Sequence, residues 1–210
     1  MLSIKFKQLI RFVVTMIVCV MTIPMQAQII DSDITLEKAL EGTSAPEEVI
    51  KRLVIVSVRY YSTDGLLHQG QIIVDSSLKE EVISLFDYIE KIKYPVEMVI
   101  PIRFDLPNNG TTMADWNNTY SFHYRPKAGG NNSLSLHSFG KAIDFNPFSN
   151  PYVNLSGTII PEKAQYNIEN PQTLTADHPL VIKFQEYGWI WGGSWTDPKD
   201  YMHFQKDSIQ

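Results

Sequence analysis

The chain has 210 residues, of which 44% are hydrophobic and 20% are charged, and its formal net charge at pH 7 is −5. This acidic balance argues against nucleic acid, and against an anionic membrane face, as a partner. Cys19 is the single cysteine. It lies in a segment that we expect to be removed, so disulfides and thiolate ligands are excluded from the mature protein.

The segment 1–27 has the pattern of a secretory signal peptide. Three basic residues precede an uncharged run at 12–23, and Ala27 provides a small residue at the expected cleavage site. The run is too short for a comfortable membrane span. An uncleaved anchor is the main alternative, and lipidation at Cys19 is a minor one. Removing three basic residues changes the net charge from −5 to −8, and we expect a secreted or periplasmic protein without a membrane span.

The rest of the chain is predicted to form a lead-in at 28–52, with short helical pieces, and one domain at 53–210 with a core of its own. The apolar, β-branched residues 53–58 predict a strand. A turn at 63–65 and a second β-branched run at 72–74 predict a hairpin.

A helix is predicted to begin near Ser77, because apolar residues then recur at helical spacing. Its predicted buried face is Leu78, Val82, Leu85, Phe86 and Ile89. Residues 96–104 predict a strand, which Pro101 is expected to break or to place at an edge. A second helix is predicted at 179–187, before Gly188. The predicted fold class is α+β, with a small, largely antiparallel sheet, packed helices and a cleft that binds a metal.

Two segments contain residue types that bind metals, and the first lies around Asp144. Alternation along a strand places Asp144 on one face, and Ile143 and Phe145 on the other. The apolar pair can then enter the core while the carboxylate faces a cleft. Gly140 permits a close approach of the backbone, so that His137 can reach the same ion.

The second segment lies near the C-terminus. His203 and Gln205 share one face of a predicted strand. Asp200 would lie on the opposite face if that strand were continuous. The site therefore requires a turn at 197–200, which Pro198 favours.

Three motifs follow one another between residues 113 and 204. They are SxHxxGxAxD at 135–144, WIWGGSW at 189–195 and DxxHF at 200–204. Together they resemble the M15 metallopeptidases, which include D-alanyl-D-alanine carboxypeptidases and L-alanyl-D-glutamate endopeptidases. The combination is far more specific than any one motif.

The resemblance implies that His137, Asp144 and His203 bind Zn²⁺ and that Asp200 is the catalytic base. Three protein ligands leave a fourth position for water, as catalytic zinc sites do. Asp200 would take the proton of that water and pass it to the leaving amine. Arg125 would stabilise the developing oxyanion or hold a substrate carboxylate.

The tryptophans of the second motif are interpreted as core and cleft wall, with Trp191 as a substrate contact. Single histidines outside the motifs are more often structural than ligating. That interpretation applies to the remaining three: His68, His123 and His178.

The function predicted from these residues is hydrolysis of peptidoglycan stem peptides by a zinc peptidase. Asp200, preceded by the motif at 191–195, resembles the endopeptidase branch of the family and favours an L-alanyl-D-glutamate-type endopeptidase. A D-alanyl-D-alanine carboxypeptidase stays open, because Arg125, Arg103 and Lys141 are available for a terminal carboxylate. A zinc-bearing binding module without catalysis is the third hypothesis, although it would have no need of Asp200.

Overall fold

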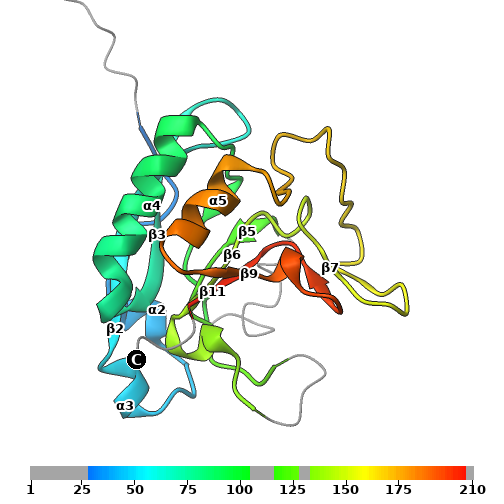
Figure 1. Ribbon diagram of the computed structural model, residues 1–210. Coiled ribbons are helices and arrows are strands. Elements are labelled where there is room, and N and C mark those ends of the chain that lie inside the picture. The colour runs from blue at the N-terminus through cyan, green and yellow to red at the C-terminus, as the bar shows by residue number, and fades with distance from the viewer. Residues whose placement is uncertain (1–27, 105–115, 128–132, 207–210) are drawn as a thin grey trace, which may run out of the picture.

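The computed structural model describes residues 28–104, 116–127 and 133–206. The predicted signal peptide lies outside them. The described part is a mixed α+β structure in which helices pack on small sheets whose strand pairs are mostly antiparallel (Figure 1). The predicted fold class is confirmed to this extent. No helix in the described ranges is long and apolar enough to cross a membrane.

The predicted hairpin is formed by β2 (Leu53–Tyr61) and β3 (Leu67–Asp75), which pair antiparallel along their whole length. Strand β1 (Ile29–Ile30) adds to β3 in parallel, which the sequence did not predict. The helices α2 (Leu36–Leu40) and α3 (Glu47–Ile50) follow β1 and bury apolar side chains against the hairpin. The division of the chain at residue 52 stays a prediction.

Helix α4 (Lys79–Ile92) buries the face that its spacing predicted, namely Val82, Leu85, Phe86 and Ile89. Helix α5 (Pro179–Glu186) begins after His178, whose ring accepts a hydrogen bond from the backbone N–H of Leu180. Gly188, at φ 76°, follows its end. Both predicted helices are confirmed, and they lie side by side on one side of the molecule (Figure 1).

The strand predicted at 96–104 is much shorter in the structure. Within the described part of that range, the strand is β4 (Met98–Val99), which pairs in parallel with β5 (Asn118–Thr119). The side chain of Asn118 then bonds both the N–H and the carbonyl of Ile100. This side chain takes the place of a partner strand just before Pro101, which has no N–H to continue a ladder.

The strands that carry the metal-binding motifs form a sheet of their own. Its central strand is β11 (His203–Gln205), which runs antiparallel to β6 (Ala142–Asp144) on one side and to β9 (Ile190–Trp191) on the other. Residues distant in sequence therefore meet on neighbouring strands.

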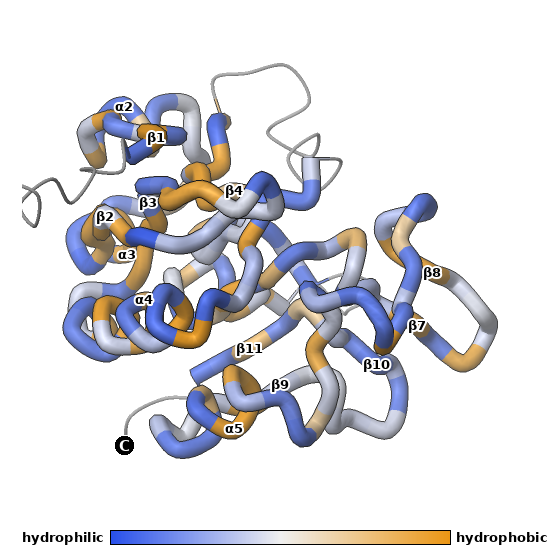
Figure 2. The backbone as a smooth tube through the Cα atoms, turned by 90° about the horizontal axis from the view of Figure 1, so that it is seen from above, coloured by the Kyte–Doolittle hydropathy of each residue, from blue (hydrophilic) through white to orange (hydrophobic). Residues whose placement is uncertain are grey.

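Another small sheet lies beside the sheet of β6, β11 and β9. Its order is β10 (Lys199–Asp200), β7 (Tyr152–Val153) and β8 (Ile159–Ile160). The β7–β8 hairpin projects to one side of the molecule (Figure 2). Strand β10 joins this sheet to the segment that leads into β11, so Asp200 lies where the two sheets meet.

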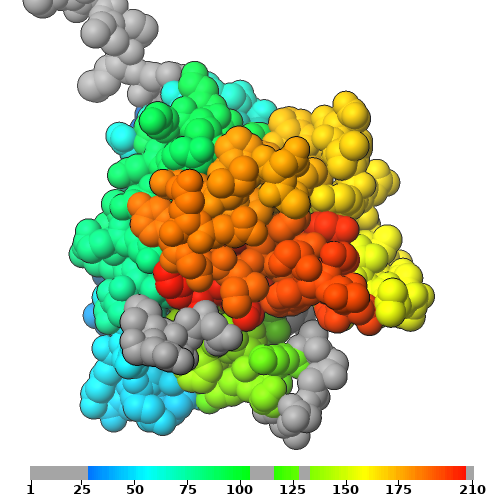
Figure 3. Space-filling view, in the orientation of Figure 1, coloured from blue at the N-terminus to red at the C-terminus, as the bar shows by residue number. Residues whose placement is uncertain are grey.

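The principal core lies between the β2–β3 hairpin, the helices α4 and α5, and the sheet of β6, β11 and β9. In the space-filling view, the segment around α5 covers the centre of one face of the molecule (Figure 3). Ile143, Phe145 and Phe204 all belong to this core. The chain segments that carry the candidate metal ligands are thus anchored by their immediate neighbours in sequence, as the alternation at residue 144 predicted.

Candidate metal centre

The register of the central sheet brings together two of the predicted ligands. Asp144 on β6 lies directly opposite His203 on β11. Directly opposed residues point to the same face of an antiparallel pair. The Nδ1 atom of His203 accordingly lies 2.9 Å from Oδ1 of Asp144.

His137 reaches the same point from the 3₁₀ helix η3 (Leu136–Phe139). Ser135 caps this helix by accepting a hydrogen bond from the backbone N–H of His137. Gly140 ends it at φ 64°, and a Cβ there would lie 2.6 Å from the backbone nitrogen of Asp75. The close backbone approach at Gly140 is therefore to β3, whereas the sequence predicted it between His137 and the strand that carries Asp144.

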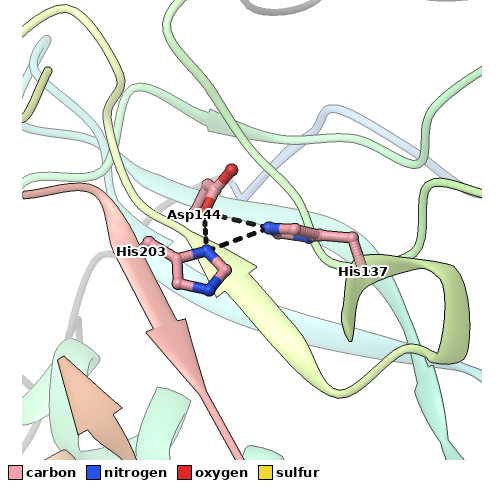
Figure 4. Close-up of side chains that lie close together, drawn as sticks. All are labelled: His137, Asp144 and His203. Atoms are coloured by element: carbon pink, nitrogen blue, oxygen red, sulfur yellow. Dashed lines mark hydrogen bonds and ion pairs between the residues drawn. The ribbon is translucent and has the colours of Figure 1, made fainter. Parts of the chain in front are cut away.

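Three ligand atoms from these separate elements converge (Figure 4). The Nε2 atom of His137 lies 3.1 Å from Oδ1 of Asp144 and 3.2 Å from Nδ1 of His203. The exposed fractions are 1% for His137, 4% for Asp144 and 7% for His203. Burial favours a raised pKa for Asp144, but the two imidazoles outweigh it and hold the pKa well below the usual range. The carboxylate is therefore ionised, as a ligand must be.

The outer nitrogen of each ring has its own hydrogen-bond acceptor. Nδ1 of His137 donates to the carbonyl of Ser121 at 2.6 Å, and Nε2 of His203 donates to Oε1 of Gln205 at 3.1 Å. In its neutral form, the form that binds a metal, each imidazole carries one proton; these acceptors place that proton on the outer nitrogen and leave the inner nitrogen with a lone pair. Two imidazole nitrogens and one carboxylate oxygen that face one another, with outer partners fixing both rings, are a donor set that fits zinc.

Asp200 lies in the same cavity but on a different sheet. It belongs to β10, which pairs with β7, and the chain turns at 201–202 before β11 begins. The strand is thus interrupted between Asp200 and His203, but the turn predicted at 197–200 was misplaced: residues 199–200 are strand, and the turn follows Asp200. Oδ1 of Asp200 is buried without a hydrogen-bond partner among the described residues. Burial, with the charge of Asp144 second, raises the pKa of this carboxyl to about 7, a value suited to proton transfer near neutral pH.

Gly192 allows the chain to pass close to Asp200. It begins the 3₁₀ helix η4 (Gly192–Ser194), and a Cβ at this position would lie 2.6 Å from the carbonyl oxygen of Asp200 and 3.3 Å from Cβ of His203. Any larger residue must therefore displace the backbone that carries both groups.

If Asp200 is the catalytic base that the M15 resemblance implies, we expect Gly192→Ala to lower kcat/KM for peptide hydrolysis by about 10²-fold, because a displacement of about 1 Å has that effect on a catalytic group. Peptide-hydrolysis assays would measure it. Gly157→Ala is the control, since a Cβ there has no atom within 4 Å. That change should cost about 1–2 kcal/mol of stability through its left-handed backbone and leave kcat/KM intact. Equal activity of the two variants would contradict the role of Gly192.

The cavity in front of the ligand atoms has a volume of about 470 Å³. Its lining includes the three candidate ligands, Asp200 and Arg125. Burial lowers the pKa of Arg125, but Tyr120 and Asp144 outweigh it and raise the pKa. The guanidinium is therefore a fixed positive charge at the cavity. Two cations considered from the sequence, Arg103 and Lys141, are absent from the described lining.

The tryptophans of the second motif divide between the core and the cavity. Trp191 is 2% exposed and its indole N–H donates to the carbonyl of Tyr201. Trp189 is also in the core. Trp195 lines the cavity, with its ring 5.5 Å from that of His203. The substrate contact assigned to Trp191 stays a prediction, and Trp195 is the indole that the structure places at the cavity.

The remaining histidines lie outside the group of ligand atoms. His68 is held between Asp31 and Asp64; burial lowers its pKa, but hydrogen bonds to the two carboxylates outweigh this and raise it. Burial and the nearby Arg125 lower the pKa of His123 to about 4. Both arrangements agree with the structural interpretation.

Several residues of the site were not found from the sequence, and Lys127 at the cavity is one of them. Ser121 and Gln205 accept from the two histidines, and Tyr152 lines the cavity opposite Asp200 in the β7–β10 register. The alternation at 203–205 was the available signal for Gln205. Ser121 and Tyr152 depend on contacts between segments distant in sequence.

Comparison with known proteins identifies the region that carries these residues. Residues 128–206 match a peptidase M15 family model described as D-alanyl-D-alanine carboxypeptidase. The match covers fewer than half of the 210 residues but includes every candidate metal ligand and Asp200. The comparisons with curated proteins and with solved structures gave no match. The resemblance to the M15 peptidases is confirmed, and the match supports a metallopeptidase.

Proposed function

Since the chain carries an M15 peptidase region, we propose that it is a zinc-dependent peptidase that hydrolyses the stem peptides of peptidoglycan. The observation that carries the proposal is the convergence of two histidine nitrogens and the Asp144 carboxylate in a cavity that also contains Asp200. We further propose secretion or a periplasmic location, with residues 1–27 as the leader that directs it.

The proposed ligands are Nε2 of His137, the carboxylate of Asp144 and Nδ1 of His203. Bound there, zinc would supply Lewis-acid chemistry, activating a water molecule and polarising the scissile carbonyl. Asp200 would accept a proton from the attacking water as the C–O bond forms. It would then return the proton to the amine as the C–N bond breaks.

Arg125 can serve the reaction in two ways. Its planar fork can bind the oxygen on which negative charge develops, or it can bind a carboxylate of the substrate. Lys127 lines the same cavity, so two cations stand there beside the carboxylates of Asp144 and Asp200. Arg125 and Lys127 are the groups that would bind a carboxylate of the substrate.

Two specificities follow from the proposal. An endopeptidase of the L-alanyl-D-glutamate type is supported by Asp200 together with the motif at 191–195. A D-alanyl-D-alanine carboxypeptidase is supported by the description of the matched family, and by Arg125 and Lys127 at the cavity. A binding module without catalysis is less well supported, because it gives no reason for a buried, unpartnered carboxyl beside the metal ligands.

We expect purified muropeptides to be cut by the mature protein, and a chelator to abolish cleavage, because the three ligands hold the metal on which the reaction depends. Adding zinc back should restore it. Mass spectrometry of the products would measure both results. Cleavage inside the stem identifies the endopeptidase, and loss of one terminal alanine identifies the carboxypeptidase. Intact muropeptides after incubation with zinc-loaded protein would refute hydrolysis and favour the binding module.

A further inference from the structure

The two candidate histidine ligands face the metal position with different nitrogens. His137 directs Nε2 inward, and His203 directs Nδ1 inward. Which nitrogen of an imidazole is free for a metal is set by the hydrogen bond that the other nitrogen makes. Each ring therefore needs an acceptor on its outer side, and the two acceptors must bond opposite nitrogens.

The acceptor for His137 is part of the backbone. The carbonyl of Ser121 lies 2.6 Å from Nδ1 of this ring. A substitution at residue 121 leaves a carbonyl in place, so the backbone itself fixes His137. No comparable backbone acceptor bonds the outer nitrogen of His203 in the part of the chain that the structure describes.

The acceptor for His203 is a side chain on the same strand. Gln205 lies two residues along β11, on the same face, and its Oε1 lies 3.1 Å from Nε2 of His203. Its partner in the β6 register is Ala142, whose methyl group leaves room for the longer side chain. Nδ1 of His203 thus faces the carboxylate of Asp144, and Gln205 fixes the ring at Nε2.

We propose that Gln205 is a positioning residue that makes Nδ1 the metal-binding atom of His203. By accepting from Nε2–H it keeps the proton on the outer nitrogen, and it opposes rotation of the ring that would replace Nδ1 with a carbon. This inference rests on the proposed function, because it assumes that the zinc ion of the proposed peptidase binds at this site. It concerns metal binding and ring orientation, and no step of hydrolysis depends on contact with Gln205.

The test compares Gln205→Met, which keeps the length of the side chain but removes the acceptor, with Gln205→Glu, which keeps an acceptor. Gln185→Met on the exposed face of α5 is the matched control. Zinc affinity would be measured by competition with a chromophoric chelator. We expect Gln205→Met to bind zinc about 10–100-fold more weakly, and Gln205→Glu and Gln185→Met to bind it within a few-fold of the unsubstituted protein.

Nitrogen-15 NMR of histidine-labelled protein gives a second readout that is independent of activity. The zinc-loaded, unsubstituted protein should carry the His203 proton on Nε2 and the His137 proton on Nδ1. In Gln205→Met the His203 signals should change and the His137 signals should not. A His203 proton on Nδ1 in the unsubstituted protein would overturn the inference even if Gln205→Met failed to fold.

Unchanged zinc affinity in a folded Gln205→Met variant would also overturn it. Failure of the proposed function looks different: the unsubstituted protein would bind zinc and leave muropeptides intact, and the dependence of zinc affinity on Gln205 would still hold.

Discussion

Asp200→Asn is expected to lower kcat on stem peptides by about 10²–10⁴-fold, the range found for loss of a general acid or base. Asparagine keeps the shape of the side chain but cannot accept the proton of the attacking water. The carboxyl it replaces is buried, has an unpartnered Oδ1 and has a pKa raised by burial to about 7. Steady-state kinetics of the zinc-loaded variant would measure the loss, and metal analysis should show stoichiometric zinc.

Asp197→Asn is the matched control for this substitution. Asp197 lies three residues earlier, is exposed, and bonds the backbone N–H of Leu155. It does not line the cavity in the described part of the chain. Its replacement should leave kcat within about twofold, since surface changes of this kind have small effects. A variant at Asp200 that retains full kcat would show that another group takes the proton.

Phe145→Ala is expected to destabilise the protein by about 3–5 kcal/mol, the cost typical of removing a buried aromatic ring. Phe145 is 0% exposed. Its ring centroid lies 5.9 Å from that of Phe86 on α4, 5.6 Å from that of Phe184 on α5 and 5.8 Å from that of Phe204 on β11. Urea unfolding of the metal-free protein would measure the loss without a contribution from zinc.

Two further substitutions test whether this loss comes from packing. Phe145→Leu should cost less, because it leaves a smaller cavity. Ile168→Ala removes an apolar side chain that is 69% exposed, and it should change stability by no more than about 0.5 kcal/mol. If Phe145→Ala cost under 1 kcal/mol, residue 145 would not be the link between the helices and the metal-binding sheet.

The parts of the fold that the sequence predicted well are those set by local pattern. The helical spacing from Val82 to Ile89 matches the buried face of α4. The alternation at 143–145 correctly places the two apolar side chains in the core and directs Asp144 to the cavity. Both patterns depend on which face of one element is buried, and residue type reports that directly.

The parts that the sequence did not predict depend on pairing between distant segments. The parallel addition of β1 to β3 has no local signal. The strand predicted at 96–104 has only two residues in the structure, because the side chain of Asn118, from another segment, forms hydrogen bonds with Ile100. In the site, the motif predicted which residues converge, but the acceptor of His137 is a backbone carbonyl that its sequence position does not reveal.

The central place of β11 has a consequence for the order of folding. The two candidate histidine ligands are 66 residues apart, and His203 arrives on a strand that must insert between β6 and β9. Loop-closure entropy opposes contacts of such long range and slows their formation. A chain that emerges from its N-terminus makes β11 after every other described strand, so the metal centre is incomplete until that strand docks. A metal centre built in this way cannot form before the last of the described strands has been made.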